Sequence, residues 1–387
     1  MNAALTLRWI HLHLSGQRSV RQRLFVLAMV FVGLSAASKL AVAEECGTSE
    51  FGVQNVSIDQ RAETAGEARD LGTRAAAETA FGVVLKRLLH DPEIVTEFVA
   101  QHDLDEFTDF VHISEENSLE GRYIALLDFC FDAARLRQSF RTSGLKWTEL
   151  RSPPILVLPV WQGPEGARAW QKNNSWLSGW RDAVETTHGL VNFVLLEPTI
   201  VNERSLRAED LARANQVTLS YAATLAGAEQ TMLVIARLDY RGATPVLTVD
   251  GQLFSRDGRL LTTLAKMVDM PVATDLAEQL GIARGEILRE MEASWYAANA
   301  ISGNDTQRLT LEVPIDSLTQ WASRLAVFDQ IAVFNGYDIR KLDIASGVIT
   351  ANVEGTIAAV ENALLAHDLK LVTDVNGRMS IVSSKTR

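Results

Sequence analysis

The hydrophobic and polar positions of the chain fall into three blocks, each of which mixes strands with helices. In the first block, apolar residues alternate or recur at helical spacing over short, well-bounded segments. They predict strands over 53–58, 110–116, 122–131 and 145–150, and helices over 65–89, 93–107 and 133–143. The order β-α-(α)-β-β-α-β predicts a small split βαβ domain over 44–150, with helices on one face of an antiparallel sheet.

The second block opens with an unbroken apolar run from Ile155 to Leu158. Such a run is typical of a strand that is buried on both faces. Prolines precede it and Pro159 follows it, and they are expected to limit the strand because proline donates no ladder hydrogen bond. The pattern then predicts helices over 176–187, 208–225 and 275–297, strands over 190–196 and 232–240, and a hairpin of 245–255 with 260–268. Together they predict a central α/β domain over 151–297.

Residues 298–308 are small and polar and lack an apolar period, which predicts a linker. Beyond it, alternation in the strands and helical spacing after Ser317 and Thr356 predict a second βαββαβ unit, ferredoxin-like, over 309–387. It ends in a hairpin around Asn376-Gly377. We see no residue identity between this unit and the first block, so we infer a shared architecture and no repeat.

The first 43 residues have the features of a secretory signal. Four arginines precede an apolar run over 24–34, and Ala41-Val42-Ala43 supplies a small-residue cleavage site. The run is short for a membrane span, no later segment is long enough, and no twin arginine precedes it. We therefore expect a periplasmic protein exported by the Sec route, without a membrane span after cleavage. A signal that stays uncleaved as an anchor is the alternative.

The net charge of the chain limits the classes of partner that it is expected to bind. The chain carries a formal net charge of −11. Cleavage after residue 43 would remove five basic residues and no acid, leaving about −16. A surface this acidic repels phosphate backbones, so nucleic acid is excluded as an expected partner. Composition does not fix the oligomeric state.

The two cysteines are Cys46 and Cys130. In an oxidising compartment they could form one disulfide bond. The other interpretation, which we favour from sequence, is a buried free thiol at Cys130, because it lies between two phenylalanines in a predicted strand.

Motifs for chemistry are missing from the sequence. It contains no phosphate-binding glycine loop, no H-E-x-x-H, no C-x-x-C and no G-x-S-x-G, and its histidines after residue 43 lie far apart. Glu185 and His188 are close in sequence, but such a pair arises easily by chance. We therefore expect no catalytic residue, no metal and no cofactor, although missing motifs do not exclude an enzyme.

The segment after Pro159 is rich in tryptophan and amides. In one interpretation, Trp176 and Trp180 lie one helical turn apart and cover the buried strand. In the other, the loop is a binding surface on which a sugar or a partner's side chain stacks. Its candidate residues are Trp161, Trp170, Asn173, Asn174, Trp176 and Trp180.

The proline-flanked strand over 153–160, with Trp170, Asn174, Trp176 and Trp180 downstream, resembles an exported bacterial family known as domain of unknown function 2066. The resemblance spans about 53–295. It implies an envelope location and brings no catalytic residues. In element order only, the central block is also similar to small periplasmic modules such as the amino-terminal domain of the Tol propeller protein and the curli secretion lipoprotein, and the last block to βαββαβ units of periplasmic assembly proteins that accept a partner's strand.

The sequence therefore favours a non-enzymatic envelope protein that binds or scaffolds another envelope component. The alternative is an envelope hydrolase or carbohydrate-binding protein that uses the loop from Trp161 to Trp180. A structural spacer is a third hypothesis, and it predicts that every exposed feature tolerates alanine.

Overall fold

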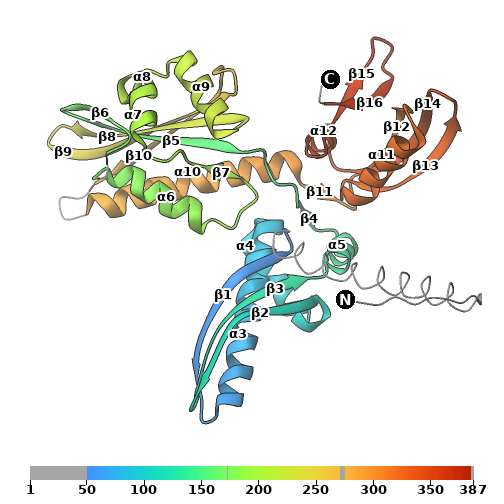
Figure 1. Ribbon diagram of the computed structural model, residues 1–387, viewed down its shortest axis with the longest axis horizontal. Coiled ribbons are helices and arrows are strands. Elements are labelled where there is room, and N and C mark those ends of the chain that lie inside the picture. The colour runs from blue at the N-terminus through green and yellow to red at the C-terminus, as the bar shows by residue number, and fades with distance from the viewer. Residues whose placement is uncertain (1–49, 172, 271–274, 385–387) are drawn as a thin grey trace, which may run out of the picture.

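The computed structural model describes residues 50–171, 173–270 and 275–384, and they form a mixed α and β protein with several sheets (Figure 1). The expected signal peptide and Cys46 lie outside the described residues. Within the described part, no helix combines the length and the hydropathy needed to cross a membrane.

The first unit is a three-stranded antiparallel sheet with helices on one side. Its elements are β1 (Gly52–Arg61), α3 (Ala65–Leu89), α4 (Pro92–Gln101), the 3-10 turn η1 (Leu104–Glu106), β2 (Thr108–Leu119), β3 (Arg122–Phe131), α5 (Ala133–Thr142) and β4 (Lys146–Trp147). The sheet order is β1-β3-β2. The bounds of α3 agree with the prediction: the Thr64 hydroxyl accepts from the Glu67 amide at its start, and His90 takes a left-handed conformation with φ 62° at its end.

The sequence predicted a fourth strand in this sheet, and that prediction is wrong. β4 does not join the sheet of β1 to β3 but pairs with β11 (Ile301–Ser302), matching Trp147 with Ile301. The short apolar segment after α5 therefore ties the first unit to a segment that is distant in the sequence.

Helix α3 covers only part of this sheet. It packs on β1 and β3, and Gly72 allows the close approach, since a Cβ at that position would lie 2.6 Å from Ile58 Cγ2. β2 lies at the open edge, where Val111 and Ile113 are more than a third exposed. The sheet thus ends in a long edge strand that no helix buries.

Cys130, on β3, is disulfide-bonded. The free buried thiol favoured from the sequence is therefore wrong. Its partner lies outside the described residues.

The central unit has a mixed sheet with helices on both faces. Its elements are β5 (Ile155–Gly163), β6 (Gly166–Arg168), α6 (Ser175–Thr186), β7 (Phe193–Val194), α7 (Ile200–Ser205), α8 (Ala208–Ala212), α9 (Gln216–Ala226), β8 (Gln230–Arg241), β9 (Thr244–Ser255), β10 (Leu260–Asp269) and α10 (Leu276–Asn299). The strand order is β10-β9-β8-β5-β6, with β7 also paired to β5. β5 runs parallel to β8, while β8, β9 and β10 are antiparallel.

The apolar run in β5 is buried on both faces, as predicted. Ile155 and Val157 belong to a core shared with α6 and α10, whereas Leu156 and Leu158 belong to a separate core shared with α8 and α9. Alternating side chains of one strand therefore serve two hydrophobic layers.

Pro159 does not end this strand, contrary to the prediction. β8 pairs with β5 along most of its length, including Pro159 opposite Val234. On the other side, β7 pairs only with Ile155 and Leu156, and β6 only from Trp161 onward. Pro159 thus lies in the gap between two short partner strands, where its missing N–H costs no ladder hydrogen bond.

Two other central elements differ from the predicted ones. The helix expected over 208–225 is two helices, α8 and α9, separated at Ala214, whose φ of 51° is left-handed. The strand expected over 190–196 is reduced to β7.

The third unit is a five-stranded sheet with two helices. Its elements are β12 (Thr306–Pro314), α11 (Leu318–Gln330), β13 (Phe334–Leu342), β14 (Ser346–Glu354), α12 (Ile357–Leu365), β15 (Leu369–Thr373) and β16 (Met379–Ser383). The order β13-β14-β12-β16-β15 extends the expected βαββαβ pattern. The terminal hairpin supplies two strands, and β16 inserts beside β12, parallel to it, leaving β15 at the edge.

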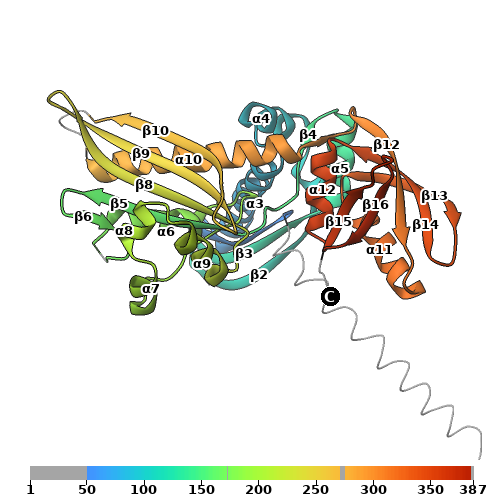
Figure 2. The same ribbon diagram turned by 90° about the horizontal axis from the view of Figure 1, so that it is seen from above.

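The linker expected over 298–308 is wrong in structural terms. α10 continues to Asn299, β11 follows, and β12 begins at Thr306. Asn299, Ile301 and Ser302 are buried. As Figure 2 shows, α10 runs along the central unit and ends beside β4 and the third unit. The division into domains at 150 and 297 stays a prediction.

Candidate functional site

The indoles of the tryptophan-rich loop lie in the core. Trp176 and Trp180, both on α6, are fully buried and pack edge to face at 5.6 Å between ring centroids. Trp176 Nε1 donates to the Val234 carbonyl of β8 at 3.0 Å, and buried Trp170 Nε1 donates to the Leu206 carbonyl at 2.7 Å. These three side chains hold α6 and the preceding loop against the sheet, so their ring faces are not open to a ligand from solvent.

The amides of the loop have different roles. Asn174 caps α6: its Oδ1 accepts from the Trp176 and Leu177 amides at 3.1 and 3.4 Å. Asn173 is exposed and Trp161 is half-buried. Both line a cavity of about 190 Å³, whose wall is completed by Arg168, Asn174, Ser175, Trp176, Leu276 and Leu280. No carboxylate lies among these residues, so this cavity lacks the acid pair that glycoside hydrolysis uses.

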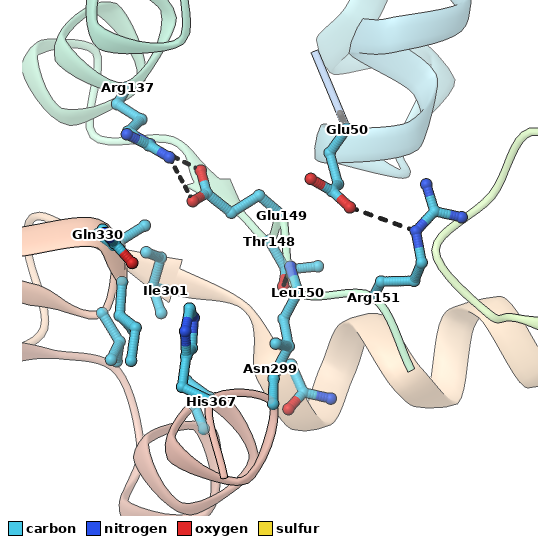
Figure 3. A pocket seen from close by; sticks show the side chains of 16 residues that line it. Glu50, Arg137, Thr148, Glu149, Leu150, Arg151, Asn299, Ile301, Gln330 and His367 are labelled. Carbon is cyan, nitrogen blue, oxygen red and sulfur yellow. Dashed lines mark hydrogen bonds and ion pairs between the residues drawn. The ribbon is translucent and has the colours of Figure 1, made fainter. Parts of the chain in front are cut away.

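A second cavity, of about 320 Å³, lies where the three units meet (Figure 3). Its apolar wall comes from Leu150, Ile301, the segment after α11 and one face of α12. At its rim, Arg137 forms a two-pronged ion pair with Glu149, with N–O distances of 2.8 and 2.6 Å. Arg151 pairs with Glu50 at 3.2 Å, and His367 points in from the end of α12. The two arginines and the two glutamates at the rim are thus paired with one another.

The units are joined beside this cavity by a buried ion pair. Glu354, at the end of β14, has no exposed surface, and its carboxylate accepts from Arg141 Nε at 3.1 and 3.0 Å. Asn335 Nδ2 donates to the same carboxylate at 2.8 Å, and Arg141 Nη2 donates to the Ala332 carbonyl at 3.2 Å. Arg141 belongs to α5, so this cluster fixes the first unit against the third.

Similar contacts fix the central unit. Arg87 of α3 donates to the His188 carbonyl at 2.6 Å and to the Glu50 and Gly52 carbonyls at 2.7 and 3.0 Å. Burial lowers the pKa of its guanidinium to about 10. Near the end of α10, the Tyr296 hydroxyl donates to the Lys146 carbonyl at 2.7 Å, and burial raises its pKa to about 12.

Glu292, also on α10, binds the loop before β7. Its two oxygens accept from the Leu190 and Val191 amides at 3.2 and 3.1 Å. Burial raises the pKa of this carboxyl, and the two backbone hydrogen bonds oppose the shift. Glu292 therefore holds α10 to the loop before β7 within the central unit.

A third concavity, a groove of about 610 Å³, lies on the first unit. It lies between α3 and β2, beside the uncovered edge of the sheet. Its floor is Tyr123, Leu127 and Phe129 of β3, and Val111 and Ile113 of β2 form one wall. Its rim carries Arg69, Asp70, Thr73 and Arg74 from α3 and Asp105 from η1. We call this the β2 groove. The sequence predicted β2 but gave no sign that α3 leaves it open.

The histidines have different surroundings. His102 stacks on Phe98 at 4.1 Å between ring centroids, and its Nδ1 lies 3.0 Å from the Phe98 carbonyl oxygen, while His112, on β2, is exposed. Burial, and secondarily Arg87, lowers the pKa of His188. Within the described ranges, no group of three or more histidine, cysteine or acidic side chains is placed to hold a metal ion.

No family model and no curated protein matches the chain. Three solved structures are similar over parts of it. Lipoprotein GNA1162 from Neisseria meningitidis aligns with a TM-score of 0.24 and 15% identity, covering 36% of this chain and 96% of that one. A PelC dodecamer from Paraburkholderia phytofirmans aligns at 0.24 and 12%, covering 37% and 90%. The LpoB C-terminal domain from Salmonella enterica aligns at 0.20 and 13%, covering 31% and 85%. At these TM-scores the similarities carry no argument about function, and the resemblance to domain of unknown function 2066 stays a prediction.

Proposed function

We propose that this chain is an exported, non-enzymatic protein of the cell envelope that binds another protein component through the β2 groove. The observation that carries the proposal is the groove itself, whose accessible apolar side chains are Val111 and Ile113 of the edge strand, 38% and 37% exposed. Beside them lie Tyr123, Leu127 and Phe129 of the neighbouring strand, each 1% exposed. An apolar concavity with a charged rim is the usual form of a binding site.

The rest of the molecule supports a scaffold role. Buried ion pairs and hydrogen bonds join the three units at α5, α10 and β14, as described above, so the groove is presented by a firmly held body. The basic, apolar and small-residue order of residues 1–43 supports export to the periplasm.

The alternative, a carbohydrate-binding protein or hydrolase built on the tryptophan loop, has less support. Trp170, Trp176 and Trp180 are buried, and the cavity beside Trp161 is about a third of the volume of the β2 groove.

Position-specific photo-cross-linking in cells tests the proposal. A benzophenone amino acid replaces Ile113 in the full chain, and Val217, which is 78% exposed on α9, is the control position. We expect a discrete adduct with a second protein from position 113 and none of that size from position 217. Identical adducts from both positions, or no adduct from 113, would contradict binding at the groove.

A further inference from the structure

We propose that β2 accepts an extended, basic segment of the partner protein as an added strand, whose apolar side chains enter the β2 groove. This rests on the proposed function and names the chemistry of the partner. Strand addition supplies affinity through backbone hydrogen bonds and specificity through the side chains that reach the groove.

The backbone edge is the first argument. Among the described residues, β2 pairs with β3 alone, although it is twelve residues long. Such a strand spans roughly 40 Å and presents unpaired N–H and C=O groups along one side. It contains no proline and no lysine, two residues by which sheets commonly block an open edge.

The side chains beside that edge are the second argument. Val111 and Ile113 lie opposite Phe129 and Leu127 in the β2–β3 register. All four line the groove, so they share one face of the sheet. A strand added next to β2 would place every second side chain on this same face, over the groove.

Charge sets the chemistry of the occupant. β2 carries Asp109, Glu115 and Glu116 and no basic residue other than His112. The arginines at the rim already face acids: Arg69 lies 3.7 Å from Glu116, and Arg74 lies 3.3 Å from Glu78. Glu116 lies opposite Ala125 on the groove face and already faces Arg69, whereas Glu115 lies opposite Leu126 on the other face of the sheet. An incoming strand with lysine or arginine on that other face is therefore complementary to Glu115.

The same charges disfavour a second copy of this chain. Antiparallel pairing of two β2 strands would bring their acidic residues near one another, which destabilises cross-strand pairs. The register of β2 also shifts between Thr108 and Phe110 and between Ile113 and Glu115. Such bulges bend the edge for any added strand, so the charges and not the bulges distinguish a second copy from a basic partner segment.

A short peptide of alternating valine and lysine is the probe, with fluorescence anisotropy as the readout and the full chain as the receptor. We expect saturable binding, and about tenfold weaker binding to the double variant Glu115→Lys/Glu116→Lys. The matched control, Glu185→Lys/Glu361→Lys, makes the same charge change at exposed positions on α6 and α12 and should bind as the parent does. A control peptide of alternating valine and glutamate, which carries the opposite charge, should not bind the parent chain.

A fully N-methylated version of the valine-lysine peptide tests strand pairing, because it has no backbone donors. Loss of binding on methylation supports the added strand. Equal binding overturns it and leaves groove docking in place. No binding of any peptide also overturns it, while the cross-link from position 113 still decides the proposed function. A dimer of the chain that Glu115→Lys/Glu116→Lys abolishes would assign the edge to a second copy and overturn the inference.

Discussion

The ion pair between Arg141 and Glu354 gives the sharpest test of how the units are held together. The Glu354 carboxylate is fully buried and accepts from Arg141 Nε, through both of its oxygens, and from Asn335 Nδ2. Arg141→Met keeps most of the side-chain volume. It leaves the Glu354 carboxylate with one hydrogen-bond donor, the side-chain amide of Asn335. Leaving a buried charge without its partner costs ~3–5 kcal/mol.

Backbone hydrogen exchange measures this cost locally. The amides of β14 and α5 should exchange about a hundred to several thousand times faster in Arg141→Met, because every ~1.4 kcal/mol changes an equilibrium tenfold. Arg74→Met is the matched control. Its partner Glu78 is exposed on the same helix, where such a pair contributes ~0.3–0.5 kcal/mol, so exchange should barely change.

The double variant Arg141→Met/Glu354→Met separates charge from packing. Because it leaves no lone carboxylate, it should recover most of the lost protection. If Arg141→Met costs no more than Arg74→Met, the ion pair does not hold the first unit to the third. If the double variant is as unstable as the single one, lost packing and not the stranded charge is responsible.

Three further outcomes follow from single positions. Gly72→Ala should destabilise the protein by ~1–3 kcal/mol in urea unfolding, because its Cβ would meet Ile58 at 2.6 Å; Gly82→Ala, on the same helix with open space around it, should stabilise by ~0.5–1 kcal/mol. The pKa of Glu292 is raised in the folded state, so folding takes up a proton there and stability falls as the pH rises from its ordinary value of 4.5 through the raised folded pKa. Glu292→Gln should remove that part of the pH dependence of the urea midpoint, and an unchanged pH profile would refute the shift. Trp176→Phe loses a buried hydrogen bond and should lower stability by ~1–3 kcal/mol without changing peptide binding; a variant of full stability would contradict its structural role.

Local signals in the sequence were sufficient for many elements. The helical spacing of apolar residues predicted α3 with its observed bounds, and the unbroken apolar run predicted that β5 is buried on both faces. These features depend on neighbours within a few residues, which a pattern of hydrophobic and polar positions records directly.

The predictions of secondary structure were wrong mainly where residues distant in the sequence determine the local structure. Pro159 is accommodated inside β5 only because β6 and β7 are short, which its own segment does not reveal. Ala214 breaks a helical pattern with a left-handed backbone although it is not glycine. Small polar composition suggested a linker, yet β11 is held by β4.

The β2 groove and the contacts that join the units could not be predicted from the sequence, because they also depend on residues that are distant in the chain. Arg141 and Glu354 are 213 residues apart, and no local pattern pairs them. The alternation around Val111 and Ile113 predicts a strand, but whether a helix covers that strand depends on where α3 packs. The tryptophans drew attention by composition, and the structure uses three of them in the core.

Hydrogen exchange along β2 tests the central claim most directly. In the free chain, the edge amides of Thr108–Leu119 should exchange rapidly, and saturating valine-lysine peptide should slow them selectively, while β13, an edge strand of the third unit, stays unchanged. Protection of β2 in the absence of peptide, or peptide binding that leaves β2 exchange unaltered, would contradict the account.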